Sequence, residues 1–162
     1  MLARLGGVDE VANEELIASA AAVLKPHTVT RYGEHLLRDG QRHGRQLGHV
    51  GCTLVTAAGN RYSGVCIDAG SGIGFCAEHA AIAAMVTAGE YRIAKIVAVW
   101  RDADGTLYVL PPCGRCREFI RQIDPANINT QVVTGRDSIR RLRELLPLHE
   151  WPPPLQPPTA DG

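Results

Sequence analysis

The stretch FCAEHAAIAAM, residues 75–85, decides the fold of this chain. It opens with a cysteine, a small residue and a glutamate, and it continues as an apolar run with helical spacing. A second stretch, PPCGRC at residues 111–116, places two more cysteines ahead of another helical pattern, CREFIRQI at 116–123. The sequence therefore predicts two helices that both begin at cysteines, with a carboxylate in the first turn of one of them.

Runs of β-forming residues surround these two helix starts. HVGCTLVTAAGNRYSGVCID, residues 49–68, predicts two strands joined by a turn at 58–60. IAKIVAVW, residues 93–100, is continuously apolar and predicts a central strand covered on both faces. LYVLPP, residues 107–112, predicts a strand that leads directly into the second cysteine motif. Both cysteine motifs therefore lie at strand-to-helix junctions, and two helix N-termini are expected to point at one place.

The remaining pattern completes a single α/β arrangement. It predicts helices at 9–24, 76–88 and 138–147 and a short strand at 130–134. Helices and strands in this order predict a three-layer α-β-α sandwich with a mixed sheet of roughly five strands.

The length and the composition of the chain predict one domain followed by a proline-rich tail. With 162 residues, 45% of them hydrophobic, we expect one domain with one core over residues 1–150. Within it, RYGEHLLRDGQRHGRQ at 31–46 is basic and poor in apolar residues, which fits either a solvated insertion or a flap over a site. The tail WPPPLQPPTADG at 151–162 is proline-rich, so we expect it to be extended or to serve as a short ligand for a partner.

Charge and composition argue against several classes of protein. Lys plus Arg and Asp plus Glu each number 17, so the chain lacks the basic excess of proteins that coat nucleic acid. No apolar run approaches the roughly 20 residues of a membrane span. The first residues, MLARLGGVDEVANEEL, contain acidic residues and no apolar core of a signal peptide, so we expect a cytoplasmic protein. Five cysteines, an odd number, favour metal or redox chemistry over a disulfide framework.

Three cysteines at the two helix starts predict a metal site: Cys76, Cys113 and Cys116. The positive end of a helix favours thiolates, and three thiolates around Zn²⁺ leave the fourth tetrahedral position for water, as in catalytic zinc sites. A structural zinc site would take a fourth protein ligand, for which Cys52 and Cys66 are available. Glu78 favours the catalytic alternative, because it can take a proton from a zinc-bound water and pass it to a leaving amine.

The pair of motifs Cys76-Ala77-Glu78 and Pro112-Cys113-Gly114-Arg115-Cys116 resembles the zinc motifs of the cytidine deaminase superfamily, and the resemblance covers about residues 48–147. Cysteine as the first ligand is typical of nucleoside deaminases, including cytidine deaminase and blasticidin-S deaminase, whereas the polynucleotide- and tRNA-editing branches generally use histidine. The resemblance implies a hydrolase with one zinc per chain, in which zinc hydroxide attacks C4 of a cytosine ring and ammonia leaves. Glu78 would shuttle the protons, the backbone amide of Ala77 would orient water or substrate, and the protein would be a homotetramer.

The resemblance is looser where the sugar of a nucleoside would bind. Cytidine deaminases carry Asn-x-Glu-Asn before the first cysteine motif, and here Cys66, Asp68 and Ala69 stand at the positions of the three polar residues. His49 stands where many cytidine deaminases place an aromatic residue, and some blasticidin-S deaminases have His-Val-Gly there. We therefore expect substrate contacts from His49, Cys66, Asp68 and Ala77, with cytidine, deoxycytidine or a blasticidin S-like nucleoside as substrate. Asp68 either suits the cationic tail of blasticidin S or is an ordinary turn residue.

Two further side chains flank the motifs. His79 and Arg115 are expected to temper the negative charge of three thiolates around Zn²⁺, with a solvent-facing position as the alternative for His79. Trp151 is expected near the site of a neighbouring subunit, as the resemblance to tetrameric deaminases implies.

Other functions remain open at this point. In a non-catalytic zinc protein, a further cysteine or His79 would close the metal coordination. A deaminase acting on nucleic acid would use the basic insertion, which carries Arg31, Arg38, Arg42 and Arg45. A deaminase acting on another amino-heterocycle would keep the same zinc motifs. A thioredoxin-like redox role for Cys113 and Cys116 would not need Cys76 and Glu78.

Overall fold

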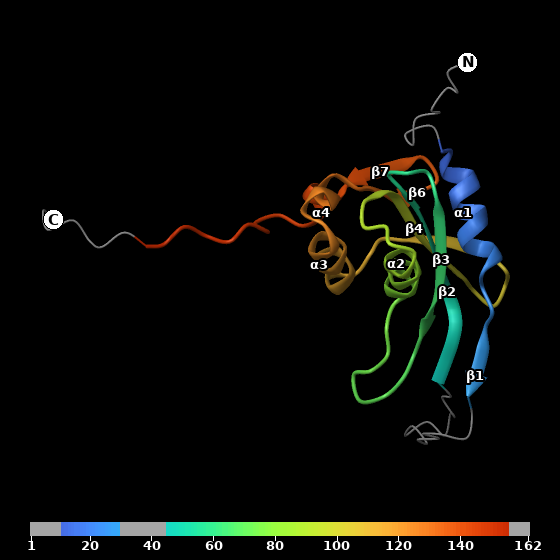
Figure 1. Ribbon diagram of the computed structural model, residues 1–162. Coiled ribbons are helices and arrows are strands. Elements are labelled where there is room, and N and C mark those ends of the chain that lie inside the picture. The colour runs from blue at the N-terminus through green and yellow to red at the C-terminus, as the bar shows by residue number, and fades with distance from the viewer. Residues whose placement is uncertain (1–10, 30–44, 156–162) are drawn as a thin grey trace, which may run out of the picture.

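A computed structural model describes residues 11–29 and 45–155 (Figure 1). Its helices are α1 (Asn13–Ala22), α2 (Ala77–Thr87), α3 (Gly114–Ile123) and α4 (Leu142–Leu145), with a 3-10 helix, η2, at Pro125–Asn129. Its strands are β1 (His27–Val29), β2 (Arg45–Thr56), β3 (Arg61–Ile67), β4 (Ile93–Arg101), β5 (Leu107–Leu110), β6 (Gln131–Gly135) and β7 (Ser138–Arg141). The predicted α/β class is confirmed.

The described strands form one seven-stranded sheet in the order β1-β2-β4-β6-β7, with β3 also paired to β2 and β5 also paired to β4. The pairing of β4 with β6 is parallel, and every other pairing is antiparallel. The sheet is therefore mixed, as predicted. It contains more strands than the roughly five expected, because the short strands β1 and β7 were not predicted.

The sheet lies between two layers of helix, with α1 on one face and α2 and α3 on the other (Figure 1). The buried run of β4 supplies side chains to both layers, which confirms the prediction of a central strand covered on both faces. One core joins α1 to Val55, Val97 and Val99, and the other joins α2 and α3 to Leu54 and Ile96. The second core holds α2 and α3 against one face of the sheet.

Helix α2 approaches β3 most closely at Gly64. A Cβ atom at this position would lie 2.4 Å from the backbone nitrogen of Ala81 and 2.5 Å from the Cβ atom of Ala80. Real Cβ atoms do not come so close to other heavy atoms, so only glycine allows this contact. The contact fixes the helix against the strands that lead into the first cysteine motif.

The predicted helix at 138–147 is wrong over its first half. Residues 138–141 form β7, which pairs with β6 from Gln131↔Arg141 to Gly135↔Ser138, and only Leu142–Leu145 is helical. The arginines and leucines of this segment have good helix propensity, but the open edge of β6 offers unpaired backbone groups, and pairing overrides propensity. The carboxylate of Glu144 then accepts a hydrogen bond from the backbone nitrogen of Arg141 at 2.6 Å, at the start of α4.

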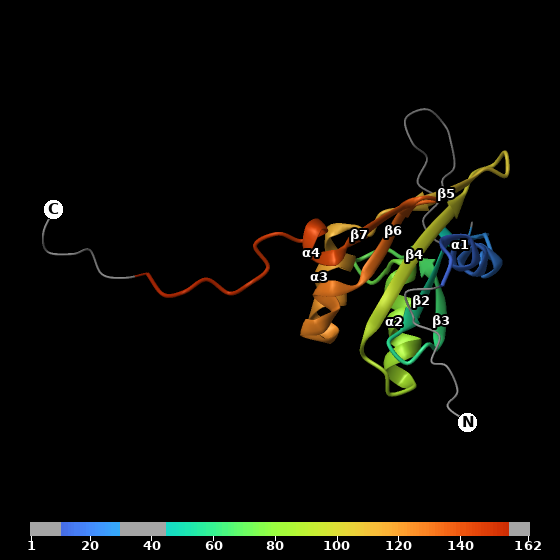
Figure 2. The ribbon, with the colours of Figure 1, turned by 90° about the horizontal axis from the view of Figure 1, so that it is seen from above.

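The structure describes only part of two predicted segments, the insertion at 31–46 and the tail at 151–162. Strand β2 begins at Arg45, so the last two residues of the predicted insertion 31–46 are in a strand, and the others lie outside the described residues. Residues 151–155 form no helix or strand and run away from the domain on the side of α3 and α4 (Figure 2). Their role, and the domain boundary at residue 150, stay predictions.

Among the described helices, none has both the length and the hydropathy of a membrane span.

Candidate active site

The two cysteine motifs meet at the starts of α2 and α3. Cys76 caps α2, Cys113 caps α3, and Cys116 lies in the first turn of α3. The Sγ atom of Cys113 is 3.8 Å from that of Cys76 and 3.5 Å from that of Cys116, and all three sulfurs lie within 4.8 Å of one another. Over the described ranges, no other group of three or more His, Cys, Asp or Glu side chains offers metal ligands this close together. Three thiolates at this spacing could hold a tetrahedral metal ion with one position open.

None of the predicted candidates for a fourth ligand joins this cluster. Cys52 is fully buried in the core, as expected for a small apolar residue. The sulfur of Cys66 contacts Val50 and His49 instead. The ring of His79 packs on Phe119 with 4.5 Å between the ring centroids. The arrangement therefore differs from the four-ligand structural site that the sequence left open.

The environment of the thiols explains why the cluster suits a cation. Burial raises the pKa of Cys76 and of Cys116 above the usual thiol value, and the charge of Glu78 adds to this effect. Burial also acts on Cys113, but hydrogen bonds from the backbone and thiol of Cys116 outweigh it and lower the pKa. A helix start was predicted to favour the thiolate and so to lower the thiol pKa. This effect outweighs burial only at Cys113. A divalent cation among the sulfurs would stabilise all three thiolates, so the donor set fits zinc.

Glu78 lies in the first turn of α2 and is 5% exposed. Burial raises the pKa of its carboxyl group, and hydrogen bonds from its own backbone and the Cys116 thiol partly offset this. A buried carboxyl group whose pKa is raised can hold and release a proton closer to neutral pH than an exposed one. The side chain lines the same cavity as Cys76 and Cys113. Glu78 is therefore placed where proton transfer beside the thiol cluster is possible.

A cavity of about 480 Å³ lies next to the cluster, and we call it the thiol cavity. It brings together most of the predicted site residues: His49, Cys66, Asp68, Cys76, Ala77, Glu78, Cys113 and Arg115. Apolar side chains to which the sequence assigned no role complete the lining, among them Phe75, Leu110 and Pro111. Phe75 directly precedes the first cysteine motif and Pro111 belongs to the second, so proximity to the motifs was the available signal.

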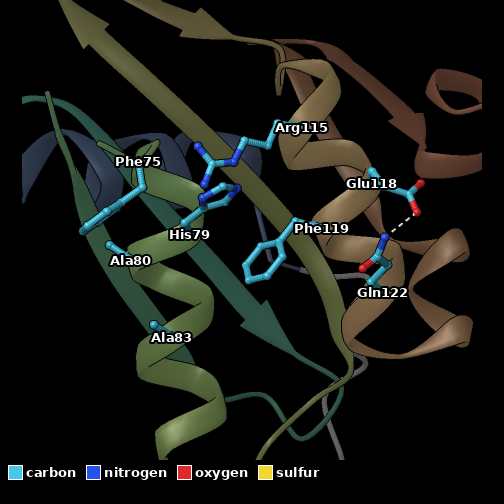
Figure 3. Close-up of a pocket in the computed structure, with 8 residues that line it drawn as sticks. All are labelled: Phe75, His79, Ala80, Ala83, Arg115, Glu118, Phe119 and Gln122. Carbon is cyan, nitrogen blue, oxygen red and sulfur yellow. Dashed lines mark hydrogen bonds between the residues drawn. The ribbon is translucent and has the colours of Figure 1, made fainter. Parts of the chain in front are cut away.

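His79 faces a second cavity of about 540 Å³ between α2 and α3, which we call the α2–α3 groove (Figure 3). Its lining consists of Phe75, His79, Ala80, Ala83, Arg115, Glu118, Phe119 and Gln122. Arg115 lines both cavities, and its Nη1 donates a hydrogen bond to the carbonyl of Gly74 at 3.3 Å. The buried Nε2 of His79 has no hydrogen-bond partner among the described residues. Arg115 therefore lies at the boundary of the two cavities, next to His79, whereas His79 lines only the groove (Figure 3).

Comparison with known proteins assigns this arrangement to a family. The sequence profile described as "Cytidine and deoxycytidylate deaminase zinc-binding region" matches residues 27–132, most of the chain, and includes all three clustered cysteines. The chain belongs to this family. The cavity described above is therefore the candidate active site of a deaminase-family protein, and the superfamily predicted from the two motifs is confirmed.

Individual relatives support the same assignment. The deaminase-family protein is 34% identical over 105 residues to a blasticidin-S deaminase of Bacillus cereus, a match that covers 62% of this chain and 75% of that one. Its structure resembles the cytidine deaminase from Mycobacterium leprae with a TM-score of 0.60 and 23% identity, over 83% of this chain and 96% of that chain. A mutant cytidine deaminase from Mycobacterium tuberculosis matches with a TM-score of 0.53 and 29% identity, over 63% of this chain and 76% of that chain.

Proposed function

We propose that this deaminase-family protein hydrolyses the 4-amino group of a cytosine-type aminopyrimidine nucleoside and releases ammonia. One observation carries the proposal: the buried carboxyl group of Glu78 shares a cavity with thiols of the cysteine cluster. The choice of a pyrimidine nucleoside rests on relatives described as cytidine deaminases and a blasticidin-S deaminase. The family itself supports the broader class of zinc-binding deaminases.

The three clustered cysteines would hold one zinc ion per chain. Zinc bound there would lower the pKa of a water molecule and so supply a nucleophile at neutral pH. Soft thiolates suit zinc better than they suit magnesium or calcium, which prefer oxygen ligands. Their positions at two helix starts hold the sulfurs on rigid elements of the fold.

Glu78 is the residue that would move the protons. It accepts a proton from the attacking water and delivers protons to the pyrimidine ring and the departing amine. A bond forms between the water oxygen and C4, the bond from C4 to the amino nitrogen breaks, and ammonia leaves. Ala77 is the first residue of α2, where backbone N–H groups have no acceptor within the helix, so its N–H can donate to the substrate.

Two kinds of nucleoside are candidates for the substrate. Cytidine and deoxycytidine carry neutral sugars, whereas blasticidin S carries a cationic guanidino group. Asp68 is an exposed residue on the lining of the thiol cavity, where its carboxylate would favour a cationic substituent. The sequence likeness to a blasticidin-S deaminase supports the second candidate, and the likeness to cytidine deaminases supports the first.

An ultraviolet assay of the zinc-loaded protein on cytidine, deoxycytidine and blasticidin S tests the proposal, with ammonia release measured in parallel. Turnover of cytidine assigns the protein to pyrimidine nucleoside metabolism. Turnover of blasticidin S alone assigns it to inactivation of that compound. A zinc-loaded protein that releases ammonia from none of the three contradicts the proposed substrates and directs the search to other amino-heterocycles.

We also propose that copies of this chain associate along α2, in keeping with the expected homotetramer. The sequence of α2, AEHAAIAAMVT, is apolar on nearly all sides, yet Ala83, Ala84 and Val86 are exposed in the single chain. A helix that is apolar all round is normally buried. The adjoining α2–α3 groove adds the ring of Phe119 and the unpartnered Nε2 of His79 to this surface. A second copy would cover both features.

A further inference from the structure

An irregularity in the pairing of β2 with β3 lies beside the thiol cavity. Leu47 pairs with Ile67 and Gly51 pairs with Val65, so the three residues 48–50 stand opposite the single residue Cys66. Extra residues on one strand form a β-bulge, which bends the strand and redirects side chains, often next to active sites. Here the bulged residues are Gly48, His49 and Val50.

The bulge is anchored at its first residue. Gly48 has a φ of 69°, which favours glycine, and a Cβ atom there would lie 2.4 Å from the carbonyl oxygen of Lys25. The backbone nitrogen of Lys25 donates a hydrogen bond to the carbonyl of Gly48 at 2.9 Å. The segment that follows α1 therefore fixes where the bulge starts.

Cys66 holds the rest of the bulge. Its Sγ accepts a hydrogen bond from the backbone nitrogen of Val50 at 3.3 Å, which satisfies an N–H group that the bulge removes from the β-ladder. The same sulfur lies 3.3 Å from Nδ1 of His49 and 3.9 Å from Nε2. Cys66 is 8% exposed, whereas His49 is half-buried, and both line the thiol cavity. The buried thiol therefore orients an imidazole that remains accessible to a ligand.

The position of this pair suggests which part of a substrate it meets. The groups of the proposed reaction, Cys76, Glu78 and Cys113, reach the cavity from the starts of α2 and α3. His49 and Cys66 reach it from β2 and β3. A pyrimidine whose amino group lies at Glu78 leaves its sugar for another part of the same lining.

We propose that His49 binds a hydroxyl group of the nucleoside sugar, and that Cys66 is a positioning residue that orients His49 through the bulge; this inference rests on the proposed function. Nδ1 is the ring nitrogen nearer to the Cys66 sulfur, and Nε2, which is farther from it, is the nitrogen that would meet the substrate. A neutral imidazole offers one donor and one acceptor, and a hydroxyl group can donate or accept, so it matches either tautomer. The site would thus recognise a sugar hydroxyl through an imidazole, in a cavity that the carboxylate of Asp68 also lines.

The test compares His49→Ala with the unaltered protein on cytidine and on its 2′-deoxy, 3′-deoxy and 5′-deoxy analogues. Loss of a hydrogen bond should lower kcat/KM for cytidine roughly 3- to 10-fold, mainly through KM. The loss should vanish for the analogue that lacks the contacted hydroxyl. His27→Ala, a replacement of an exposed histidine in β1 outside the cavity, is the matched control. An equal loss on all four substrates, or no loss, overturns the role of His49.

The role of Cys66 has its own variants. Cys66→Ala should show the same dependence on sugar hydroxyls as His49→Ala, and the double variant should be no worse than either single one. Cys66→Ser should restore part of the preference, because a hydroxyl group can also accept the Val50 N–H. Cys52→Ala, which removes a fully buried thiol that does not line the cavity, controls for loss of stability. Equal effects of Cys52→Ala and Cys66→Ala on the hydroxyl preference overturn the positioning role.

Binding separates failure of this inference from failure of the proposed function. Calorimetric titration of zinc-loaded Glu78→Gln with the same four nucleosides reads the hydroxyl preference without turnover. Binding that depends on one hydroxyl and on His49 supports the inference even if turnover belongs to another substrate. Turnover with an unchanged preference in His49→Ala overturns the inference alone. Absence of both binding and turnover overturns the inference and the proposed function together.

Discussion

Replacement of Glu78 and replacement of Cys113 are expected to remove different properties of the protein: turnover in the first case and zinc binding in the second. Glu78→Gln removes the proton-transfer group but no thiol, so kcat should fall about 10²- to 10⁴-fold while the zinc content stays unchanged. Cys113→Ser removes one of the clustered thiols, so the zinc content itself should fall. Metal analysis beside steady-state kinetics distinguishes the two results. Glu150→Gln, at an exposed carboxylate, should change neither. A Glu78→Gln variant with full activity would contradict the assigned role.

The metal-site residues could be identified from the sequence for one common reason. Three cysteines and a glutamate at fixed spacing from two helix starts point to metal chemistry because few other arrangements need those residue types there. The contact of Cys66 with His49 could not be predicted, because it depends on a bulge that neither strand propensity nor alternation reveals. His79 follows Glu78 directly, but a helix turns about 100° per residue, which directs the side chain into the groove.

At the scale of elements, the contact of β3 with α2 predicts a sensitive glycine. Gly64→Ala would place a Cβ atom 2.4 Å from the backbone of Ala81, so the helix must move away from the strand. Overpacking of this kind should lower the free energy of unfolding by about 1–3 kcal/mol in urea titration. Gly114→Ala, at a helical position with nothing within 4 Å of the added Cβ atom, is the matched control and should not destabilise the protein. Equal stability of both variants would contradict this packing.

The turn between β2 and β3 is tied to the end of α2 by Glu90. Tyr62 Oη and Asn60 Nδ2 donate to its Oε1 at 2.6 Å and 2.7 Å, and hydrogen bonds from Thr56, Tyr62 and Asn60 hold the pKa of Glu90 below its usual value. Because the pKa is lower in the folded state, this stabilisation is present above about pH 4.3 and is lost as the pH falls through the folded pKa.

Glu90→Gln tests this pH dependence. The variant should be less stable than the parent at neutral pH, and the difference should shrink as the pH falls below about 4.3 and through the lowered pKa, because the parent carboxylate becomes protonated there. Urea unfolding across this range measures the difference. Glu150→Gln, whose carboxylate is largely exposed, is the control. A difference that stays constant with pH would contradict the assignment.

Elements with a strong internal pattern were predicted, and elements that depend on a neighbour were not. The elements β4 and α2 were predicted because each segment contains a continuous run of apolar residues that indicates burial by itself. Residues 138–141 became β7 because β6 offers an edge, which is information held by another part of the chain. Strand β1 has only three residues, too few to show a period, and its pairing with Arg45–Leu47 defines it.

For the whole molecule, the exposed apolar face of α2 predicts assembly. Ala83→Glu would place a charge on this face, so the protein should shift to smaller species when its mass is measured by light scattering after size-exclusion chromatography. Ala18→Glu, at an exposed position in the middle of α1, is the matched control and should leave the mass unchanged. A parent protein that is monomeric, or an Ala83→Glu variant with the parent's mass, would contradict association through α2.

The three-layer arrangement was predictable because alternating strands and helices leave few ways to bury both kinds of element. Which residues face one cavity was only partly predictable. Side chains from β2, β3, α2 and α3 converge in the thiol cavity across long separations in sequence, and the motifs identified only those near the cysteines. The apolar lining from Ala98 and Leu110 depends on the register of β4 with β5, which places these two residues opposite each other.

The central claim is that this protein uses water to replace an amino group on a pyrimidine nucleoside. The most direct measurement is turnover of cytidine and blasticidin S by the zinc-loaded protein in ¹⁸O-labelled water, with mass spectrometry of the product and ammonia determined in parallel. We predict that the pyrimidine product gains one labelled oxygen for each ammonia released, and that Glu78→Gln slows the appearance of both signals about 10²- to 10⁴-fold. Absence of ammonia with both nucleosides, or a product without labelled oxygen, would contradict the claim.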